Sequence, residues 1–190
     1  MFYLSSPTDE EIRALLRARA EAPFTYKDVG VTRDELSVAP SGFKLDRYGT
    51  ELGRGQEVFE RAREVLSKIG NYPPSFTRVV RLTDVIEPGM MFATVASHFG
   101  FVSVHPCRMI FVEQNEHRLA FGFGTLPGHA ESGEERFEVS IREDVVRYDV
   151  QAFSRPDGWV ARIGAPVNRA FQLRFQRETK AWMGSLTDLV

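Results

Sequence analysis

Residues 121–137 read FGFGTLPGHAESGEERF, two apolar strand-like runs around a segment rich in glycine and carboxylates. The pattern predicts a hairpin with a long loop from Thr125 to Arg136. Connections beyond about five residues exceed what the pairing of two strands needs, and loops of that kind more often shape a site. The loop is therefore the first place where we expect functional residues.

The rest of the chain predicts strands on both sides of this hairpin. Apolar residues alternate with polar ones most clearly at Phe137, Val139 and Ile141, so each strand has one dry and one wet face. The short turns predict antiparallel neighbours, because a parallel crossover needs about a dozen residues or more. His105-Pro106 interrupts one strand and predicts a bulge or an edge position. Seven strands are expected, at 43–51, 76–82, 90–96, 101–104 with 108–113, 119–124, 136–141 and 145–153.

Three segments predict helices. Thr8 with Glu11 forms a capping-box pattern, and a helix from about Asp9 to Ala20 is expected as an accessory element within 8–21. A second helix follows Gly53-Arg54-Gly55 and ends at Gly70, and a third, long helix follows Pro156. Pro166 should kink or split that last helix. Its apolar positions include Val160, Ile163, Phe171, Phe175 and Trp182.

These elements predict an α+β fold in one domain spanning 1–190. A seven-stranded antiparallel sheet twists and curls, and one long C-terminal helix laid in its hollow covers the dry face. A two-layer α+β sandwich and a closed barrel are the alternatives. The chain has 15 phenylalanines, which indicates a thick core or an apolar cavity.

The topology resembles the helix-grip fold of the START and birch-pollen-allergen superfamily, over roughly residues 43–186. The motifs resemble a narrower family, DUF1990 (UPF0548), found in bacteria and plants. They are Gly53-Arg54-Gly55 with Phe59 and Ala62, the run GTLPGH…SGEERF from Gly124 to Phe137, and Ala152-Phe153-Ser154-Arg155-Pro156. The narrower resemblance implies no reaction. The wider one implies a hydrophobic small molecule held between the sheet and the long helix.

The loop offers candidate catalytic residues, which are His129, Glu131, Glu134 and Glu135. His129 could titrate near neutral pH, and the glutamates could raise its pKa or share a proton with it. The alternative is a solvated turn in which the glutamates pair with Arg136. Because side chains alternate along a strand, Glu135 shares a face with Phe137, and Glu135 becomes a buried carboxylate if Phe137 faces a cavity.

Further residues are candidates for contact with a ligand: Asp46, Tyr48, Pro127, Phe137, Tyr148, Phe171 and Phe175. Asp46 and Tyr48 share one face of the first strand, and the alternative for them is a wet strand face. The aromatic stripe of the last helix could equally be core.

Composition and motifs argue against several classes of protein. A net charge of -2 gives no basic field for nucleic acid, and the single cysteine excludes an internal disulfide. The histidines show no zinc spacing, so no metal is expected, and no nucleotide fingerprint is complete, so no cofactor is expected. No signal peptide or membrane span is predicted, and a cytoplasmic location fits. The oligomeric state stays open.

Three functions follow from this reading. The first is binding of a small hydrophobic or amphipathic metabolite between the sheet and the C-terminal helix. The second is a cyclase-, hydratase- or hydrolase-like enzyme that uses His129 and a loop glutamate. The third is a protein-interaction module with an exposed apolar patch.

Overall fold

The computed structural model describes residues 1–98, 100–157 and 165–187. Seven of its strands form one antiparallel sheet in the order β2-β8-β7-β6-β5-β4-β3, and the short strand β1 pairs with β5. The strands are β1 (Phe2–Tyr3), β2 (Lys44–Arg54), β3 (Thr77–Arg81), β4 (Met91–His98), β5 (Phe101–Asn115), β6 (Arg118–Thr125), β7 (Glu131–Arg142) and β8 (Val145–Pro156). The helices are α1 (Asp9–Arg17), α2 (Gln56–Ser67) and α4 (Ala165–Thr187), and η1 (Val31–Arg33) is a short 3-10 helix.

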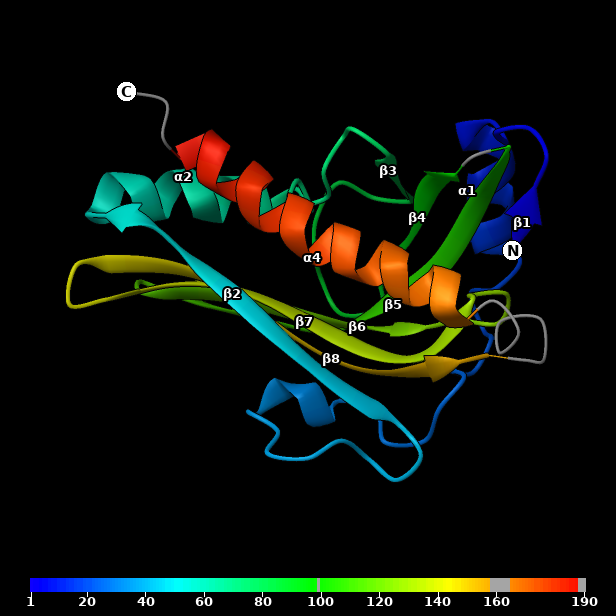
Figure 1. The fold of residues 1–190 in the computed structure, drawn as a ribbon, viewed down its shortest axis with the longest axis horizontal. Coiled ribbons are helices and arrows are strands. Elements are labelled where there is room, and N and C mark those ends of the chain that lie inside the picture. The colour runs from blue at the N-terminus through cyan, green and yellow to red at the C-terminus, as the bar shows by residue number, and fades with distance from the viewer. Residues whose placement is uncertain (99, 158–164, 188–190) are drawn as a thin grey trace.

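The long helix α4 crosses the hollow side of the curved sheet (Figure 1). The predicted sheet wrapped around a C-terminal helix is confirmed. The closed barrel is wrong for the described strands, because β2 and β3 are the two ends of the strand order and do not pair with each other. None of the helices described is both long enough and apolar enough to cross a membrane.

The start of α4 differs from the prediction. Strand β8 continues to Pro156, and α4 begins at Ala165. Pro166 is therefore the second residue of the helix, where a missing N–H is no loss, and it does not kink α4. The predicted apolar positions Val160 and Ile163 lie outside the described residues.

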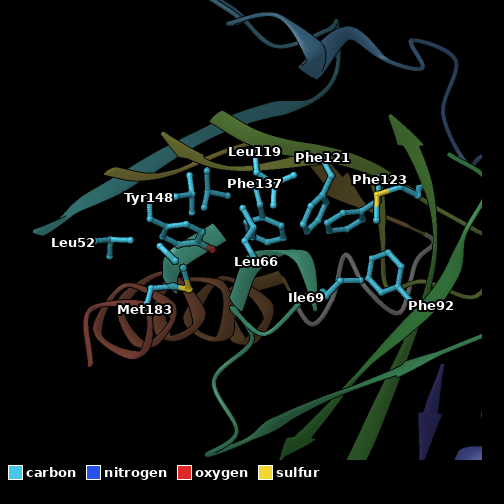
Figure 2. Close-up of a cluster of buried hydrophobic side chains, with 14 of the residues drawn as sticks. Leu52, Leu66, Ile69, Phe92, Leu119, Phe121, Phe123, Phe137, Tyr148 and Met183 are labelled. Atoms are coloured by element: carbon cyan, nitrogen blue, oxygen red, sulfur yellow. The ribbon is translucent and has the colours of Figure 1, made fainter. Parts of the chain in front are cut away.

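The main core lies between the sheet and the two helices α2 and α4. Figure 2 shows the rings of Phe121, Phe123, Phe137 and Tyr148 in one layer between the sheet and the helices. Met183 of α4 is fully buried against this layer. The C-terminal half of α4 is fixed further by Trp182, whose indole N–H donates to the carbonyl of Gly70 at 2.8 Å.

Strand β5 passes through His105-Pro106 without a break. It lies between β4 and β6, Pro106 stands opposite Ala93, and the register shift falls later, between Met109 and Phe111. The predicted bulge or edge position at His105-Pro106 is therefore wrong. The Pro106 carbonyl still accepts a hydrogen bond from the Leu126 N–H at 3.1 Å, so the ring removes only a donor.

The glycine-rich loop is shorter than predicted. Strand β6 ends at Thr125 and β7 begins at Glu131, so the polar residues from Glu131 to Arg136 belong to a strand. Gly133 allows this segment to pair as a strand with β8. The two strands approach so closely here that a Cβ at position 133 would lie 2.0 Å from the Phe153 carbonyl oxygen. Glycine thus serves strand pairing at this point, and the loop proper covers only residues 126–130.

Candidate functional site

A cavity of about 570 Å3 lies between the sheet and the N-terminal half of α4. Ligand pockets commonly begin near 300 Å3, so the space can take a small molecule. Aromatic rings form much of its wall, among them Tyr48, Tyr72, Phe101, Phe123, Phe171 and Phe175.

The N-terminal half of α4 covers the cavity, and its C-terminal half covers the core. Phe171, Gln172, Phe175 and Gln176 line the cavity, at a spacing that places them on one helix face. None of these four is fully buried, whereas Thr179 and Met183 further along are 0% exposed. The predicted contacts Phe171 and Phe175 thus reach the cavity, while Met183 belongs to the core.

Glu135 is one of the acidic side chains that the sheet directs into the cavity. It alternates on β7 with Gly133 and Phe137, and its remaining accessible surface lies in the cavity wall. Burial raises the pKa of Glu135 to about 8, and the charges of Glu131 and Asp46 act in the same direction. Hydrogen bonding with Tyr48 offsets part of the rise. At neutral pH the Glu135 carboxyl is therefore mostly protonated and can donate a hydrogen bond.

Glu134 borders the cavity but has its carboxylate fully engaged on the outer side of the sheet. Its oxygens accept hydrogen bonds from the Tyr26 hydroxyl at 2.8 Å, the Gly30 N–H at 2.7 Å and the Thr32 N–H at 2.9 Å, and also from the Thr32 hydroxyl. These donors belong to the segment before β2, which packs on that face. Glu134 therefore holds a loop in place and is not free to transfer protons in the cavity.

His129 lines the cavity, but its environment is the opposite of the predicted one. Burial lowers the pKa of His129 to about 3, and the nearby N-terminal amino group also acts to lower it. Its Nδ1 accepts a hydrogen bond from the Glu131 backbone N–H at 2.9 Å, while a Glu131 carboxylate oxygen accepts from Gln172 at 2.5 Å. The expectation that a loop glutamate raises the His129 pKa is wrong, because burial dominates and the carboxylates point elsewhere.

Sequence reasoning missed a group of imidazoles beside His129. The Ser103 hydroxyl lies 2.6 Å from His98 Nε2 and 2.8 Å from His105 Nε2, and the His105 ring lies 4.7 Å from the His129 ring. Burial lowers the pKa of His98 and of His105, so all three rings are neutral at pH 7. We call this group the imidazole end of the cavity. Its signal in the sequence was the in-phase spacing of Phe101, Ser103, His105 and Cys107 along one strand face.

Asp46 and Tyr48 of β2 both line the cavity. Asp46 is paired across the cavity rim with Arg169 of α4, at 2.9 Å between Oδ2 and Nη1. Burial raises the pKa of Tyr48 well above its usual value, so its hydroxyl keeps its proton. The alternative of a solvated strand face does not hold for these two residues.

Three residues predicted to contact a ligand are not in the cavity lining. Phe137 and Tyr148 are 0% exposed in the core, and the Tyr148 hydroxyl lies 3.1 Å from Asn71 Nδ2 and 3.2 Å from Thr179 Oγ1. Pro127 is exposed at the turn, where its carbonyl accepts a hydrogen bond from Arg19 at 2.7 Å. The inward face of the sheet is divided between core and cavity, and these rings fall on the core side.

The described residues contain no group of three or more His, Cys, Asp or Glu side chains suited to a metal ion. Cys107 lines the cavity, and burial raises the pKa of its thiol well above the usual value. A protonated thiol is a poor nucleophile, so Cys107 contributes apolar wall.

Comparisons with known proteins identify the family of the chain. The sequence profile of DUF1990, described as a domain of unknown function, matches residues 25–181. A UPF0548 protein from Dictyostelium discoideum is 28% identical over 195 residues, which cover 92% of this chain and 90% of that protein.

Two solved structures share the fold. A hypothetical protein from Helicobacter pylori matches with a TM-score of 0.58 and 11% identity, covering 81% of this chain and 98% of that chain. The Zhui aromatase/cyclase from Streptomyces sp. R1128 matches with a TM-score of 0.51 and 10% identity, covering 76% and 91% of the two chains. At such identities the likeness is one of fold.

Proposed function

This chain belongs to the DUF1990 family, and from its cavity we propose that it binds a small apolar or amphipathic molecule between the sheet and α4. The observation that carries the proposal is an aromatic-walled space of about 570 Å3 with a protonated carboxyl group inside it. A space of this size in a well-packed protein would be costly if it served packing alone.

Apolar burial supplies the affinity in this proposal. Covering about 300 Å2 of apolar ligand surface is worth about 7 kcal/mol before the entropic costs of association. The polar groups of the cavity then orient the ligand. These groups include the Glu135 carboxyl, the Tyr48 hydroxyl and the side chains of the imidazole end.

Filling the cavity tests this function. Ala152 lines the cavity on β8, so Ala152→Phe should reduce its volume and weaken the binding of an apolar fluorescent dye at least tenfold. Ala170→Phe is the matched control, because Ala170 is exposed on α4 and is not a lining residue. Native mass spectrometry of the purified protein should also show a bound small molecule. Equal dye binding by both variants and the wild type would refute the proposal.

A second candidate is a proton-transfer enzyme, and the raised pKa of Glu135 favours it. An acid that keeps its proton at neutral pH can donate it to a substrate as a general acid. His129 is the expected partner of the glutamate, but it forms no hydrogen bond or ion pair with a carboxylate among the described residues, and its Nδ1 accepts from the Glu131 backbone N–H. Glu135→Gln should then abolish turnover while leaving binding of the substrate intact, whereas a pure binding protein has no turnover to lose.

A docking surface for a partner protein gains no support from the described residues. Their exposed large apolar side chains are few and come from four parts of the chain: Phe2 and Leu4, Val29 and Val38, Val85, and Leu173.

A further inference from the structure

Glu135 lines the cavity and forms no ion pair with any side chain of the described residues. We propose that its ligand is an apolar amine, bound as the ammonium ion with Glu135 as its counter-ion. This inference rests on the proposed binding function and specifies the class of ligand.

Glu135 differs from the neighbouring carboxylates in its partner, because its hydrogen bond is with the neutral Tyr48 hydroxyl. Asp46 is paired with Arg169, Glu131 accepts from Gln172, and Glu134 is held by four donors. Within residues 1–98, 100–157 and 165–187, Glu135 forms no ion pair, and it lines the cavity. A buried carboxyl group without a cation is costly, and a ligand cation would remove that cost.

The charges around Glu135 favour a cation over an anion. Glu131 on the same strand and Asp46 on β2 both act to keep a proton on Glu135. Arg169 of α4 is engaged by Asp46 and by Gln172. The other titratable groups that sense Glu135 are neutral hydroxyl and thiol groups, those of Tyr48, Tyr72, Cys107 and Tyr148. A second negative charge here would be repelled, and a positive charge would be attracted.

The walls suit an organic cation as well. Tyr48, Tyr72, Phe123 and Phe175 line the same cavity, and ring faces attract ammonium groups within about 6 Å. The protein already uses this interaction once near the cavity, because the Arg174 guanidinium lies 4.1 Å from the centre of the Phe76 ring. Aromatic walls can thus accept both the apolar body of the ligand and part of its charge.

The imidazole end requires no second charge on the ligand. His98, His105 and His129 are neutral at pH 7. Burial lowers the pKa of the nearby Met1 amino group to about 6, so this group is also mostly uncharged at pH 7. An apolar or uncharged polar tail therefore fits this end. The main competing class is a neutral ligand that accepts a hydrogen bond from protonated Glu135, and pH separates the two classes.

The pH dependence follows from the raised pKa of Glu135. An ammonium ion needs the ionised carboxylate, whose population grows about 50-fold between pH 6 and pH 8 when the pKa is about 8. Affinity for the amine should rise by about that factor over this range. A neutral acceptor should bind best at low pH and weaken above pH 8. Binding of the amine at pH 7 should also release about 0.9 proton.

The experiment compares three matched probes on the wild-type protein: phenylbutylamine, phenylbutanol and phenylbutyric acid. Titration calorimetry at pH 6, 7 and 8, in buffers of different ionisation enthalpy, gives both affinity and proton release. At pH 8 we expect the amine to bind at least tenfold more tightly than the alcohol, and the acid to bind most weakly. Dodecylamine, dodecanol and dodecanoic acid repeat the comparison with a longer apolar body.

Glu135→Gln keeps the shape of the side chain and removes its charge. This variant should bind the amine and the alcohol equally and lose the pH dependence, while Glu87→Gln, at an exposed site, should behave as the wild type. If Glu135→Gln does not fold, the pH series on the wild type decides alone. Binding of the alcohol or the acid as tightly as the amine, or affinity for the amine that does not rise with pH, would overturn this inference and leave the proposed function standing. Failure of all six probes and of the apolar dye would reject the proposed function itself.

Discussion

Replacement of Glu135 by glutamine should make the protein more stable, by an amount that depends on pH. The folded protein holds the Glu135 proton up to about pH 8, whereas the unfolded chain releases it near pH 4.5. Below pH 4.5 both states carry the proton, so ionisation of the Glu135 carboxyl group does not affect the free energy of unfolding. Between pH 4.5 and 8 only the folded state carries it, so the stability of the wild type falls as pH rises.

The size of the effect follows from the two pKa values. At about 1.4 kcal/mol per pKa unit, the difference between 4.5 and about 8 corresponds to about 5 kcal/mol over the whole window and about 3 kcal/mol at pH 7. Solvation of the carboxylate by water that enters the cavity would reduce the shift, so these values are upper limits. Glutamine has no proton to lose, and Glu135→Gln should escape this loss.

Urea denaturation of the wild type, Glu135→Gln and the control Glu87→Gln at several pH values between 4.5 and 8.5 provides the assay. The advantage of Glu135→Gln over the wild type should grow steadily with pH, while Glu87→Gln should track the wild type. A difference between wild type and Glu135→Gln that is constant across this range would show that the Glu135 pKa is not raised, and would refute the reasoning.

Three further substitutions test the fold around the site. Glu134→Gln places an amide donor against the donors of Tyr26, Gly30 and Thr32 and should cost about 2 to 4 kcal/mol, with limited proteolysis showing cleavage in the segment 24–36; an unchanged cleavage pattern would contradict the role of Glu134. Met183→Ala should cost about 2 to 5 kcal/mol in urea denaturation, because Met183 is 0% exposed, while Leu173→Ala on the exposed face of α4 should stay within about 0.5 kcal/mol. Gly133→Ala should lower the melting temperature sharply, since its Cβ would meet the Phe153 carbonyl oxygen at 2.0 Å, and a wild-type melting temperature would mean that β7 and β8 are further apart than described.

The fold was accessible from the sequence because its signals are local and repeated. The alternation at Phe137, Val139 and Ile141 identifies the dry face of β7, and short turns allow only antiparallel neighbours. The capping box at Thr8 marks the start of α1 correctly, with the Glu11 N–H donating to the Thr8 hydroxyl at 3.3 Å. These features depend on residues that are close together along the chain, so they can be recognised in one sequence.

The site was less accessible because it depends on contacts between distant segments. Glu131 to Arg136 reads as a loop, since glycine and charges are rare in strands, but the partners that hold Glu134 lie about a hundred residues earlier. His105-Pro106 reads as an interruption, although β4 and β6 keep it inside the sheet. The direction of the His129 pKa shift depends on burial, which no local pattern reveals.

The sequence also did not indicate which inward-facing residues of the sheet belong to the core and which line the cavity. Phe137 and Glu135 are two residues apart on one strand face, yet only Glu135 lines the cavity. The difference comes from α2 and from the path of α4, which close over Phe137 and leave space above Glu135. Sequence patterns identify the face, and only the packing of the helices identifies which part of it is empty.

The most direct test of the account is to find which protein protons lie against a bound apolar probe. Nuclear Overhauser effects between phenylbutylamine and the protein should come from the rings of Phe123, Phe171 and Phe175 and from the side chain of Glu135, all of which line the cavity. Effects from exposed side chains such as Leu173 alone, with none from those rings, would contradict the claim that a ligand occupies the space beneath α4.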